Sequence, residues 1–317
     1  MSSLVKDTFD SMSREIAKII VGQEEVIEFL YVALLTEGHI LFEGVPGVAK
    51  TLIMKVLSVV IKSDFKRIQF TPDLMPSDIV GTNVFNPAKS EFYLKKGPIF
   101  TNLLLADEIN RTPPKTQSAL LEAMEERQIT IEGETLSLPS LFMVLATQNP
   151  IEYEGTYPLP EAQLDRFILK VNINYPGEKE ENLILQNHHR GFNPHNLDKL
   201  NLQSVTDIKG ILDCRAKVQE VKVEEKIFDY IIKITRRTRE TVNLILGASP
   251  RASVMLLLAS KALASLRGRD FVVPDDVKYL AYPVLRHRLV LRSEAEIEGL
   301  SSDDIISNIL QGIEVPR

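Results

Sequence analysis

The segment Gly44–Thr51 constrains this chain most, because its residues fit a tight loop between a buried strand and a helix. It reads Gly-Val-Pro-Gly-Val-Ala-Lys-Thr and follows the largely apolar run His39–Phe42. In loops of this kind, small residues let backbone N–H groups face phosphates, and the following helix adds its positive N-terminal end. We therefore expect Lys50 to reach the outer phosphates of a nucleoside triphosphate and the Thr51 hydroxyl to bind Mg²⁺.

Position 49 departs from the strict pattern, because alanine stands where glycine usually precedes the lysine. A residue with a Cβ atom disfavours positive φ, whereas glycine accepts it readily. We therefore expect Ala49 to have negative φ, with its methyl group directed away from the phosphates.

A second apolar run, Leu103–Ala106, ends in the adjacent carboxylates Asp107 and Glu108. A continuous apolar run is typical of a parallel strand covered on both faces, and the C-terminal ends of such strands hold the ligands of α/β sheets. We expect Asp107 to join the Mg²⁺ shell and Glu108 to orient an attacking water, a pair that indicates hydrolysis. The alternative is that both acids are solvated residues opening a loop.

A third apolar run, Leu141–Thr147, is followed by Gln148 and Asn149. Asn149 would then lie at another strand end, where its amide can hold the water or the γ-phosphate. Taken alone, an asparagine before a proline is typical of a turn. Its place behind the acidic strand favours the functional interpretation.

Together these motifs resemble those of MoxR-type AAA+ ATPases, and the resemblance covers nearly the whole chain. The segments that carry it are Gly44–Thr51, Arg67–Asp78, Asp107–Arg111, Ala146–Pro150 and Pro160–Phe167. The resemblance implies an α/β fold: an AAA+ P-loop core with a five-stranded parallel sheet, followed by an all-α lid domain. It also implies that alanine is accepted at position 49.

The resemblance further assigns roles that spacing alone does not. Arg166 matches an arginine that reaches the γ-phosphate of a neighbouring subunit, and Arg251, after Pro250, matches a second nucleotide sensor. From the residues alone, Arg166 is a surface arginine at a helix end and Arg251 is structural. The expected catalytic residues are Lys50, Asp107, Glu108, Asn149, Arg166 and Arg251, and the expected Mg²⁺ ligands are Thr51 and Asp107.

The nucleotide site is expected to draw on two segments. Val21–Gln23 resembles the segment that contacts adenine in the family. The expected ATP-binding residues are Val21, Gly22, Gln23, Gly44, Val45, Pro46, Gly47, Val48, Ala49, Lys50, Thr51 and Leu52.

The pattern of the chain changes near Pro176. Residues 1–176 alternate strand-like and helix-like segments and form the expected nucleotide-binding core, while 177–317 read as helix after helix and form the expected lid. Within that lid, Glu224–Thr241 and Arg251–Leu266 have helical periodicity, and Pro274 opens another helix.

Two hairpin patterns interrupt the core. One joins Asn83–Asn86 to Glu91–Lys95, and the other spans Gln128–Leu138 around Gly133. In the wider branch that includes magnesium chelatase subunits and replicative minichromosome maintenance motors, such hairpins project toward a central pore. They are therefore candidate levers on a client, or alternatively rigid packing elements.

Composition limits the remaining function classes. The 317 residues carry a net charge of −6, which argues against an intrinsic nucleic-acid clamp, since such proteins neutralise phosphates with basic surfaces. Cys214 is the single cysteine, so no disulfide framework forms within one chain. The chain shows no signal segment and no apolar run of membrane-spanning length. We expect a soluble cytoplasmic protein.

The resemblance implies an ATP-hydrolysing, chaperone-like remodeller that assembles as a homo-oligomeric ring, expected to be a hexamer. Its expected partner is a protein client, typically one with a von Willebrand factor A domain, in complex maturation or metal insertion. Two alternatives remain open at this point: a motor that acts on nucleic acid, and a nucleotide-gated scaffold with little turnover.

Overall fold

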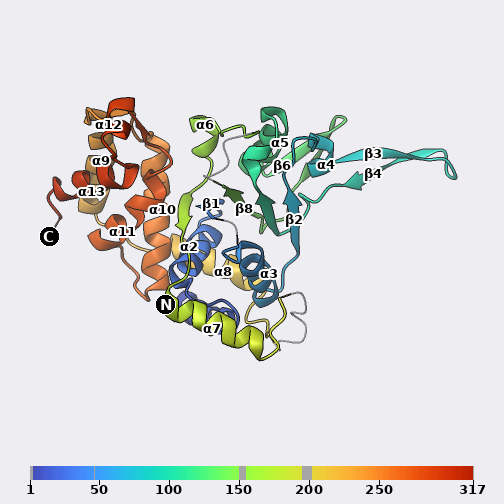
Figure 1. Cartoon of the computed structure of the whole chain (residues 1–317), viewed down its shortest axis with the longest axis horizontal. Helices are drawn as coiled ribbons and strands as arrows, with labels where there is room; N and C mark the ends of the chain where they lie inside the picture. The colour runs from blue at the N-terminus through green and yellow to red at the C-terminus, as the bar shows by residue number, and fades with distance from the viewer. Residues whose placement is uncertain (1–2, 46, 150–154, 195–201, 317) are drawn as a thin grey trace.

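The computed structural model describes residues 3–45, 47–149, 155–194 and 202–316, and its centre is a five-stranded parallel sheet. The order across the sheet is β2-β5-β8-β1-β9 (Figure 1). The strands are β1 (Ile40–Gly44), β2 (Phe65–Gln69), β5 (Leu103–Asp107), β8 (Met143–Gln148) and β9 (Leu169–Ile173). The predicted five-stranded parallel sheet is confirmed.

Alternating side chains of these strands enter two hydrophobic clusters, one on each face of the sheet. Leu103 and Leu105 pack with helices α1 (Ser3–Ala17), α2 (Glu24–Leu35) and α3 (Lys50–Val60). Leu104 and Ala106 pack instead with α5 (Pro114–Glu126). Because neighbouring strand residues point to opposite faces, a continuous apolar run is what a sheet covered on both sides requires.

Both predicted hairpins are present. The strands β3 (Gly81–Asn86) and β4 (Glu91–Lys96) follow the short helix α4 (Pro76–Val80), and β6 (Gln128–Ile131) pairs with β7 (Glu134–Ser137). The β3–β4 hairpin projects well beyond the sheet (Figure 1). At its base, the Asn83 amide donates to the Glu132 carboxylate over 2.7 Å, so the two hairpins contact each other.

The second half of the chain is mainly helical, as expected. Its helices are α7 (Glu178–His189), α8 (Ile208–Gln219), α9 (Glu225–Glu240), α10 (Pro250–Leu266), α11 (Pro274–Leu285), α12 (Ser293–Ile297) and α13 (Ser302–Gln311). It also holds one antiparallel strand pair that the sequence pattern did not indicate, formed by β10 (Leu244–Leu246) and β11 (Val290–Leu291). These strands are too short to show a periodicity of their own.

Helix α8 packs against α1 and α2 of the core as well as against the lid helix α10 (Figure 1). The buried Arg215 guanidinium on α8 donates to the Leu34 carbonyl oxygen of α2 over 2.8 Å. The domain boundary predicted at Pro176 from the change of pattern along the chain stays a prediction. In the described part of the chain, no helix combines the length and the apolar character that a membrane crossing requires.

Candidate active site

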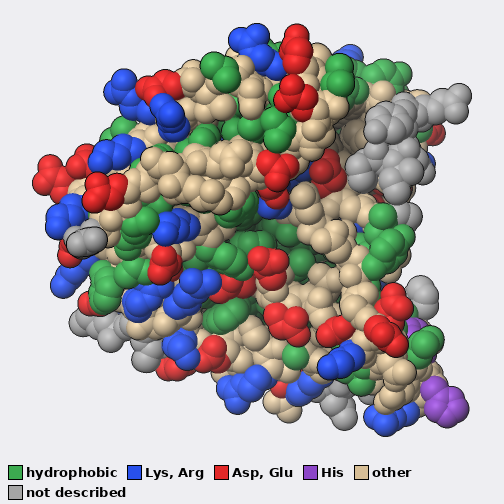
Figure 2. Space-filling model, turned by 60° about the vertical axis from the view of Figure 1, so that its left-hand side comes forward, with side chains coloured by type: hydrophobic (Ala, Val, Ile, Leu, Met, Phe, Trp, Pro, Cys, Tyr) green, Lys and Arg blue, Asp and Glu red, His purple; other side chains and the backbone are tan. Residues whose placement is uncertain are grey.

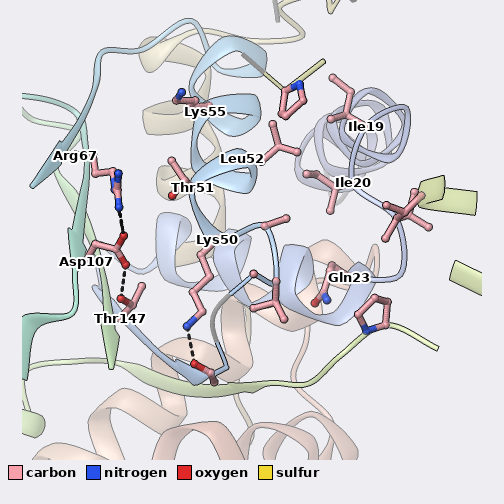
Figure 3. A pocket seen from close by; sticks show the side chains of 18 of the residues that line it. Ile19, Ile20, Gln23, Lys50, Thr51, Leu52, Lys55, Arg67, Asp107 and Thr147 are labelled. Atoms are coloured by element: carbon pink, nitrogen blue, oxygen red, sulfur yellow. Dashed lines mark hydrogen bonds and ion pairs between the residues drawn. The ribbon is translucent and has the colours of Figure 1, made fainter. Parts of the chain in front are cut away.

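A cleft of about 630 Å³ lies where α3 begins and where β5 and β8 end (Figure 3). The structure brings most of the expected site residues to it. Those that line it are Val21, Gln23, Gly44, Gly47, Val48, Ala49, Lys50, Thr51, Leu52, Asp107, Glu108 and Asn149. Gly22 and Val45 are not among the lining residues, and Pro46 lies outside the described residues.

The loop before α3 has the open cradle that phosphate binding needs. Gly47 has φ of +88°, and a Cβ atom added there would meet nothing within 4 Å. Gly44 is restricted for a different reason, since a Cβ atom would lie 2.4 Å from the Ile173 carbonyl oxygen of β9. Glycine is thus required at 47 by its φ and at 44 by the close approach of β9.

The expectation of negative φ at Ala49 is wrong. Ala49 has φ of +60° and ψ of 20°, which is the left-handed region, and it directly precedes the first helical residue, Lys50. The turn into α3 needs a left-handed residue here. An alanine adopts it at a cost of about 1 kcal/mol, small enough for the surrounding helix and strand to offset.

Lys50 points into the cleft, where its ammonium donates to the Gly44 carbonyl oxygen over 2.8 Å (Figure 3). Burial lowers the pKa of Lys50 from its ordinary value, and the nearby carboxylates of Asp107, Glu108 and Glu43 oppose that fall. The ammonium therefore lies near the Gly44 carbonyl oxygen and three carboxylates, which favour its charged form.

Asp107 is held by two neighbours at the end of β5. The Thr147 hydroxyl of β8 donates to one carboxylate oxygen over 2.7 Å, and the Arg67 guanidinium of β2 donates to the other over 2.6 Å (Figure 3). Thr147 also accepts the backbone N–H of Glu108 over 2.8 Å. The two acids are thus fixed from both neighbouring strands.

Glu108 has φ of 57°, a left-handed conformation that turns the chain sharply after β5. The Gln69 amide donates to its Oε2 atom over 2.7 Å, and Arg111 pairs with the same oxygen at 3.1 Å. The sequence analysis missed the roles of Arg67, Gln69 and Thr147. Arg67 and Gln69 are two residues apart on β2, so their side chains share one face of the strand, and Gln69 is in register with Asp107. Two polar side chains at this spacing within the Arg67–Asp78 motif were the available signal for a role at the site.

The opposite end of the cleft is apolar. Ile19, Ile20 and Leu52 line it from the core, and Ile184 and Phe192 line it from α7 and the turn that follows. An apolar wall with few polar groups suits a purine ring. Sequence reasoning missed Ile19 and Ile20, which immediately precede the expected segment Val21–Gln23.

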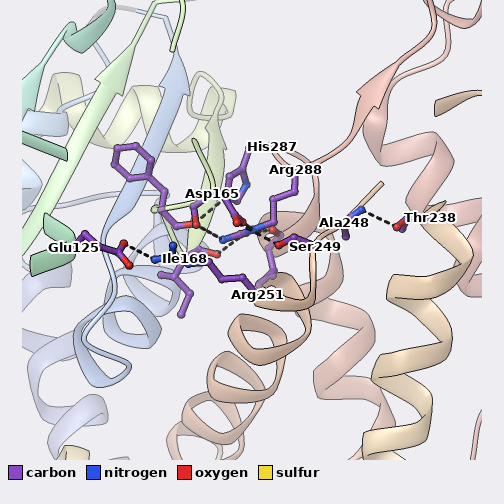
Figure 4. Close-up of polar contacts among 11 residues, drawn as sticks. Glu125, Asp165, Ile168, Thr238, Ala248, Ser249, Arg251, His287 and Arg288 are labelled. Carbon is purple, nitrogen blue, oxygen red and sulfur yellow. Dashed lines mark hydrogen bonds and ion pairs between the residues drawn. The ribbon is translucent and has the colours of Figure 1, made fainter. Parts of the chain in front are cut away.

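The two expected arginines do not line this cleft. Arg166 is half-buried just after the short helix α6 (Glu161–Leu164). Arg251, in the first turn of α10, forms an ion pair with Glu125 of α5 at 2.5 Å (Figure 4). Their roles toward a nucleotide stay predictions.

The residues present fit ATP with Mg²⁺. Mg²⁺ prefers oxygen ligands, and the Thr51 hydroxyl and the Asp107 carboxylate both line the cleft. The open space over Gly47, the start of α3 and the Lys50 ammonium suit a polyphosphate.

The fold and the cleft are typical of a P-loop nucleotide-binding protein with an attached lid, and comparison with known proteins agrees. Residues 39–169 match the ATPase family associated with various cellular activities (AAA), and residues 236–309 match the AAA lid domain. The chain is 44% identical to chaperone MoxR1 of Mycobacterium tuberculosis over 96% of its own length and 81% of that protein. The chain therefore belongs to the MoxR family of AAA+ ATPases.

Two further similarities support the assignment. The chain is 46% identical to the uncharacterized protein YeaC of Bacillus subtilis, over 95% of this chain and 92% of that protein. The crystal structure of a putative ATPase from Cytophaga hutchinsonii superposes with a TM-score of 0.92 at 42% identity, covering 100% of this chain and 97% of that one. Magnesium-chelatase subunits are more distant relatives, as with the Chlorella vulgaris subunit at 27% identity over 86% of this chain.

Proposed function

We propose that this protein hydrolyses ATP in the cleft and that the reaction is completed between neighbouring copies in a ring. The observation that carries the proposal is the meeting of the Lys50 loop with the paired carboxylates Asp107 and Glu108 in one cavity. A binding site alone requires no second carboxylate, whereas hydrolysis requires a group that orients the water and accepts its proton.

Each residue then has a defined task. The loop N–H groups and Lys50 bind the phosphates, and Glu108 orients the water, with Asn149, the residue after β8, lining the same cleft. Thr51 and Asp107 would hold Mg²⁺, which neutralises charge on the phosphate oxygens when bound. Phosphoryl transfer depends on positioning and electrostatics rather than covalent help, so a preorganised cleft suits it.

The location of Arg166 supports completion of the site by a second copy. Arg166 does not line the cleft of its own chain; it is half-buried just before the start of β9, whereas the Lys50 loop follows the end of the neighbouring parallel strand β1. An arginine supplied by a neighbouring subunit is a common catalytic device in this chemistry. We infer a homo-oligomeric ring, expected to be a hexamer, in which Arg251 of the lid reports the nucleotide of its own subunit.

The output of the cycle is proposed to be the remodelling of a protein partner. The β3–β4 hairpin carries exposed aromatic side chains, with Phe92 70% and Phe85 49% exposed and their ring centroids 5.2 Å apart. Such a projecting apolar element suits contact with another protein. On the face in Figure 2, basic side chains are interspersed with acidic ones, which favours a protein over a nucleic-acid partner. The partner proposed from the family is a von Willebrand factor A domain protein, met in the cytoplasm during complex maturation or metal insertion.

The experiment that tests hydrolysis is the steady-state ATPase rate against protein concentration with Mg²⁺, for the wild type and Glu108→Gln. Glu122→Gln, an equivalent change at an exposed residue of α5, is the matched control. We expect the specific rate to rise with concentration in the wild type and the control, and to vanish in Glu108→Gln while ATP still binds. A background rate in all three proteins, despite ATP binding, would favour the scaffold function instead.

A further inference from the structure

A buried arginine joins the lid to the core, and we call its contacts with residues 165–168 the lid–core seam. Arg288 follows α11, and its side chain is only 2% exposed (Figure 4). Its Nε atom donates to Asp165 Oδ1 over 2.6 Å. Its Nη2 atom donates to the backbone oxygens of Asp165 and Phe167 over 3.2 and 2.7 Å.

The remaining nitrogen of Arg288 completes the set. Nη1 donates to the Ile168 carbonyl oxygen over 3.3 Å and to the Val284 carbonyl oxygen of α11. A guanidinium has five N–H donors, and here all five have acceptors, four of them in residues 165–168. Because a buried charge with every donor satisfied is costly to displace, the lid holds this segment in one geometry.

Asp165 is also held from a second lid element. The Ser249 hydroxyl, at the start of α10, donates to Asp165 Oδ2 over 3.2 Å (Figure 4). Two residues further along is Arg251, the expected nucleotide sensor. One carboxylate oxygen of Asp165 thus contacts Arg288, which follows α11, and the other contacts Ser249 at the start of α10.

The segment that the lid grips is the one that carries Arg166. Asp165 is the C-cap of α6, and Arg166 is the next residue. Its backbone conformation is therefore fixed by contacts from its own lid rather than by the core alone. Movement of α10 or of the turn after α11 would move Arg166.

We propose that Asp165, clamped by Arg288 and Ser249, is a positioning residue that links the lid of one subunit to the Arg166 finger which that subunit presents to its neighbour. The proposal rests on the proposed function, because it needs Arg166 to act between copies. It deepens that function by naming the contact through which the state of one site is passed to the next.

The test uses Asp165→Asn, which keeps the shape of the side chain and removes its charge. Asp303→Asn is the matched control, since Asp303 forms a comparable pair with Arg286 at 2.9 Å, and the further bond of that arginine goes to the Lys170 carbonyl oxygen of β9 rather than to residues 165–168. We expect Asp165→Asn to lower the ATPase rate at saturating ATP about tenfold, because a charge-assisted hydrogen bond becomes a neutral one. The affinity for a fluorescent ATP analogue should stay unchanged, and the control should retain the wild-type rate.

Mixing experiments then show on which subunit Asp165 acts. Glu108→Gln subunits have an inactive cleft and an intact finger, so they should restore activity to Asp165→Asn subunits, as they should to Arg166→Ala subunits. Arg166→Ala subunits should not restore activity to Asp165→Asn subunits, because neither has a working finger. Arg288→Lys, which keeps the charge with fewer donors, should behave as Asp165→Asn does.

The outcomes distinguish a failure of the Asp165 inference from a failure of the proposed shared site. Recovery when Asp165→Asn is mixed with Arg166→Ala, and none with Glu108→Gln, would mean that Asp165 serves its own cleft, which overturns the inference. A wild-type rate for Asp165→Asn alone would also overturn it. If Arg166→Ala and Glu108→Gln fail to restore each other, the shared site itself is wrong, and the inference fails with it.

Discussion

The cleft and the lid–core seam each contain an arginine–aspartate pair with a separation of 2.6 Å, yet the two pairs differ in their surroundings. In the cleft, the Arg67 side chain is 45% exposed and that of Asp107 is 18% exposed. In the seam, the Arg288 side chain is 2% exposed and that of Asp165 is 23% exposed. Water can replace the partners in the first pair far more easily than in the second. The exposed Arg67–Asp107 pair is therefore a contact that a ligand can replace, whereas the buried Arg288–Asp165 pair stabilises the fold.

The largest expected effect on stability comes from breaking the seam. Arg288→Met should lower the free energy of unfolding by about 3 kcal/mol, since it leaves Asp165 and several backbone oxygens without their donor. Arg67→Met is the matched variant in the cleft and should change it by less than about 1 kcal/mol. Urea denaturation of both proteins at constant protein concentration measures the difference. Equal losses would remove the contrast between the two regions.

Acid should weaken the seam through His287. This histidine is buried, its Nε2 atom lies 3.0 Å from the Phe167 carbonyl oxygen, and burial together with Arg288 holds its pKa well below 6.5. The folded state thus binds fewer protons than the unfolded state below pH 6.5, and stability falls as the pH drops through that range. The loss is at most about 1.4 kcal/mol per pH unit for one such group.

The variant His287→Gln isolates this contribution. His39, in the core, has its pKa lowered to about 3 mainly by burial, and it stays in place in the variant. Denaturation midpoints from pH 7.5 to 5 should therefore fall less steeply for His287→Gln than for the wild type. Parallel pH profiles would show that His287 does not contribute.

The smallest expected effect concerns exchange within the cleft. The Arg67 guanidinium donates to Oδ2 of Asp107, so we expect it to compete with a cation for that carboxylate. Arg67→Gln should therefore lower the Mg²⁺ concentration at half-maximal nucleotide binding about threefold, in keeping with a partly exposed pair. A Mg²⁺ titration with a fluorescent nucleotide measures it.

Lys66→Gln is the control for that titration, because it removes one positive charge from the neighbouring, exposed position of β2. It should leave the Mg²⁺ requirement unchanged. A higher Mg²⁺ requirement in Arg67→Gln would mean that Arg67 positions Asp107 for the metal rather than competing with it.

The sequence predicted the features that depend on neighbouring residues. The Lys50 loop, the acidic end of β5 and both hairpins each carry a local pattern, and the structure contains all of them. The prediction of negative φ at Ala49 was wrong, because local propensity disfavours the left-handed region that the turn into α3 imposes. Family resemblance, rather than periodicity, supplied the expected roles of Arg166 and Arg251.

The contacts that were missed join distant parts of the chain. Arg67 meets Asp107 only because β2 and β5 are neighbours in register, and Arg288 meets Asp165 across 123 residues. Neither pairing leaves a periodic signal in one segment. Such contacts depend on the tertiary fold, which is why the seam emerged only from the structure.

The central claim, a catalytic site shared between copies, is tested most directly by the ATPase rates of Arg166→Ala and Glu108→Gln, alone and mixed in equal amounts. Each variant alone should bind ATP but hydrolyse it at a rate near background. Random mixing pairs an intact cleft with an intact finger at about one quarter of the interfaces of a ring, so the mixture should recover up to that fraction of the wild-type rate. A mixture that stays at background, although both variants assemble and bind ATP, would contradict the shared site.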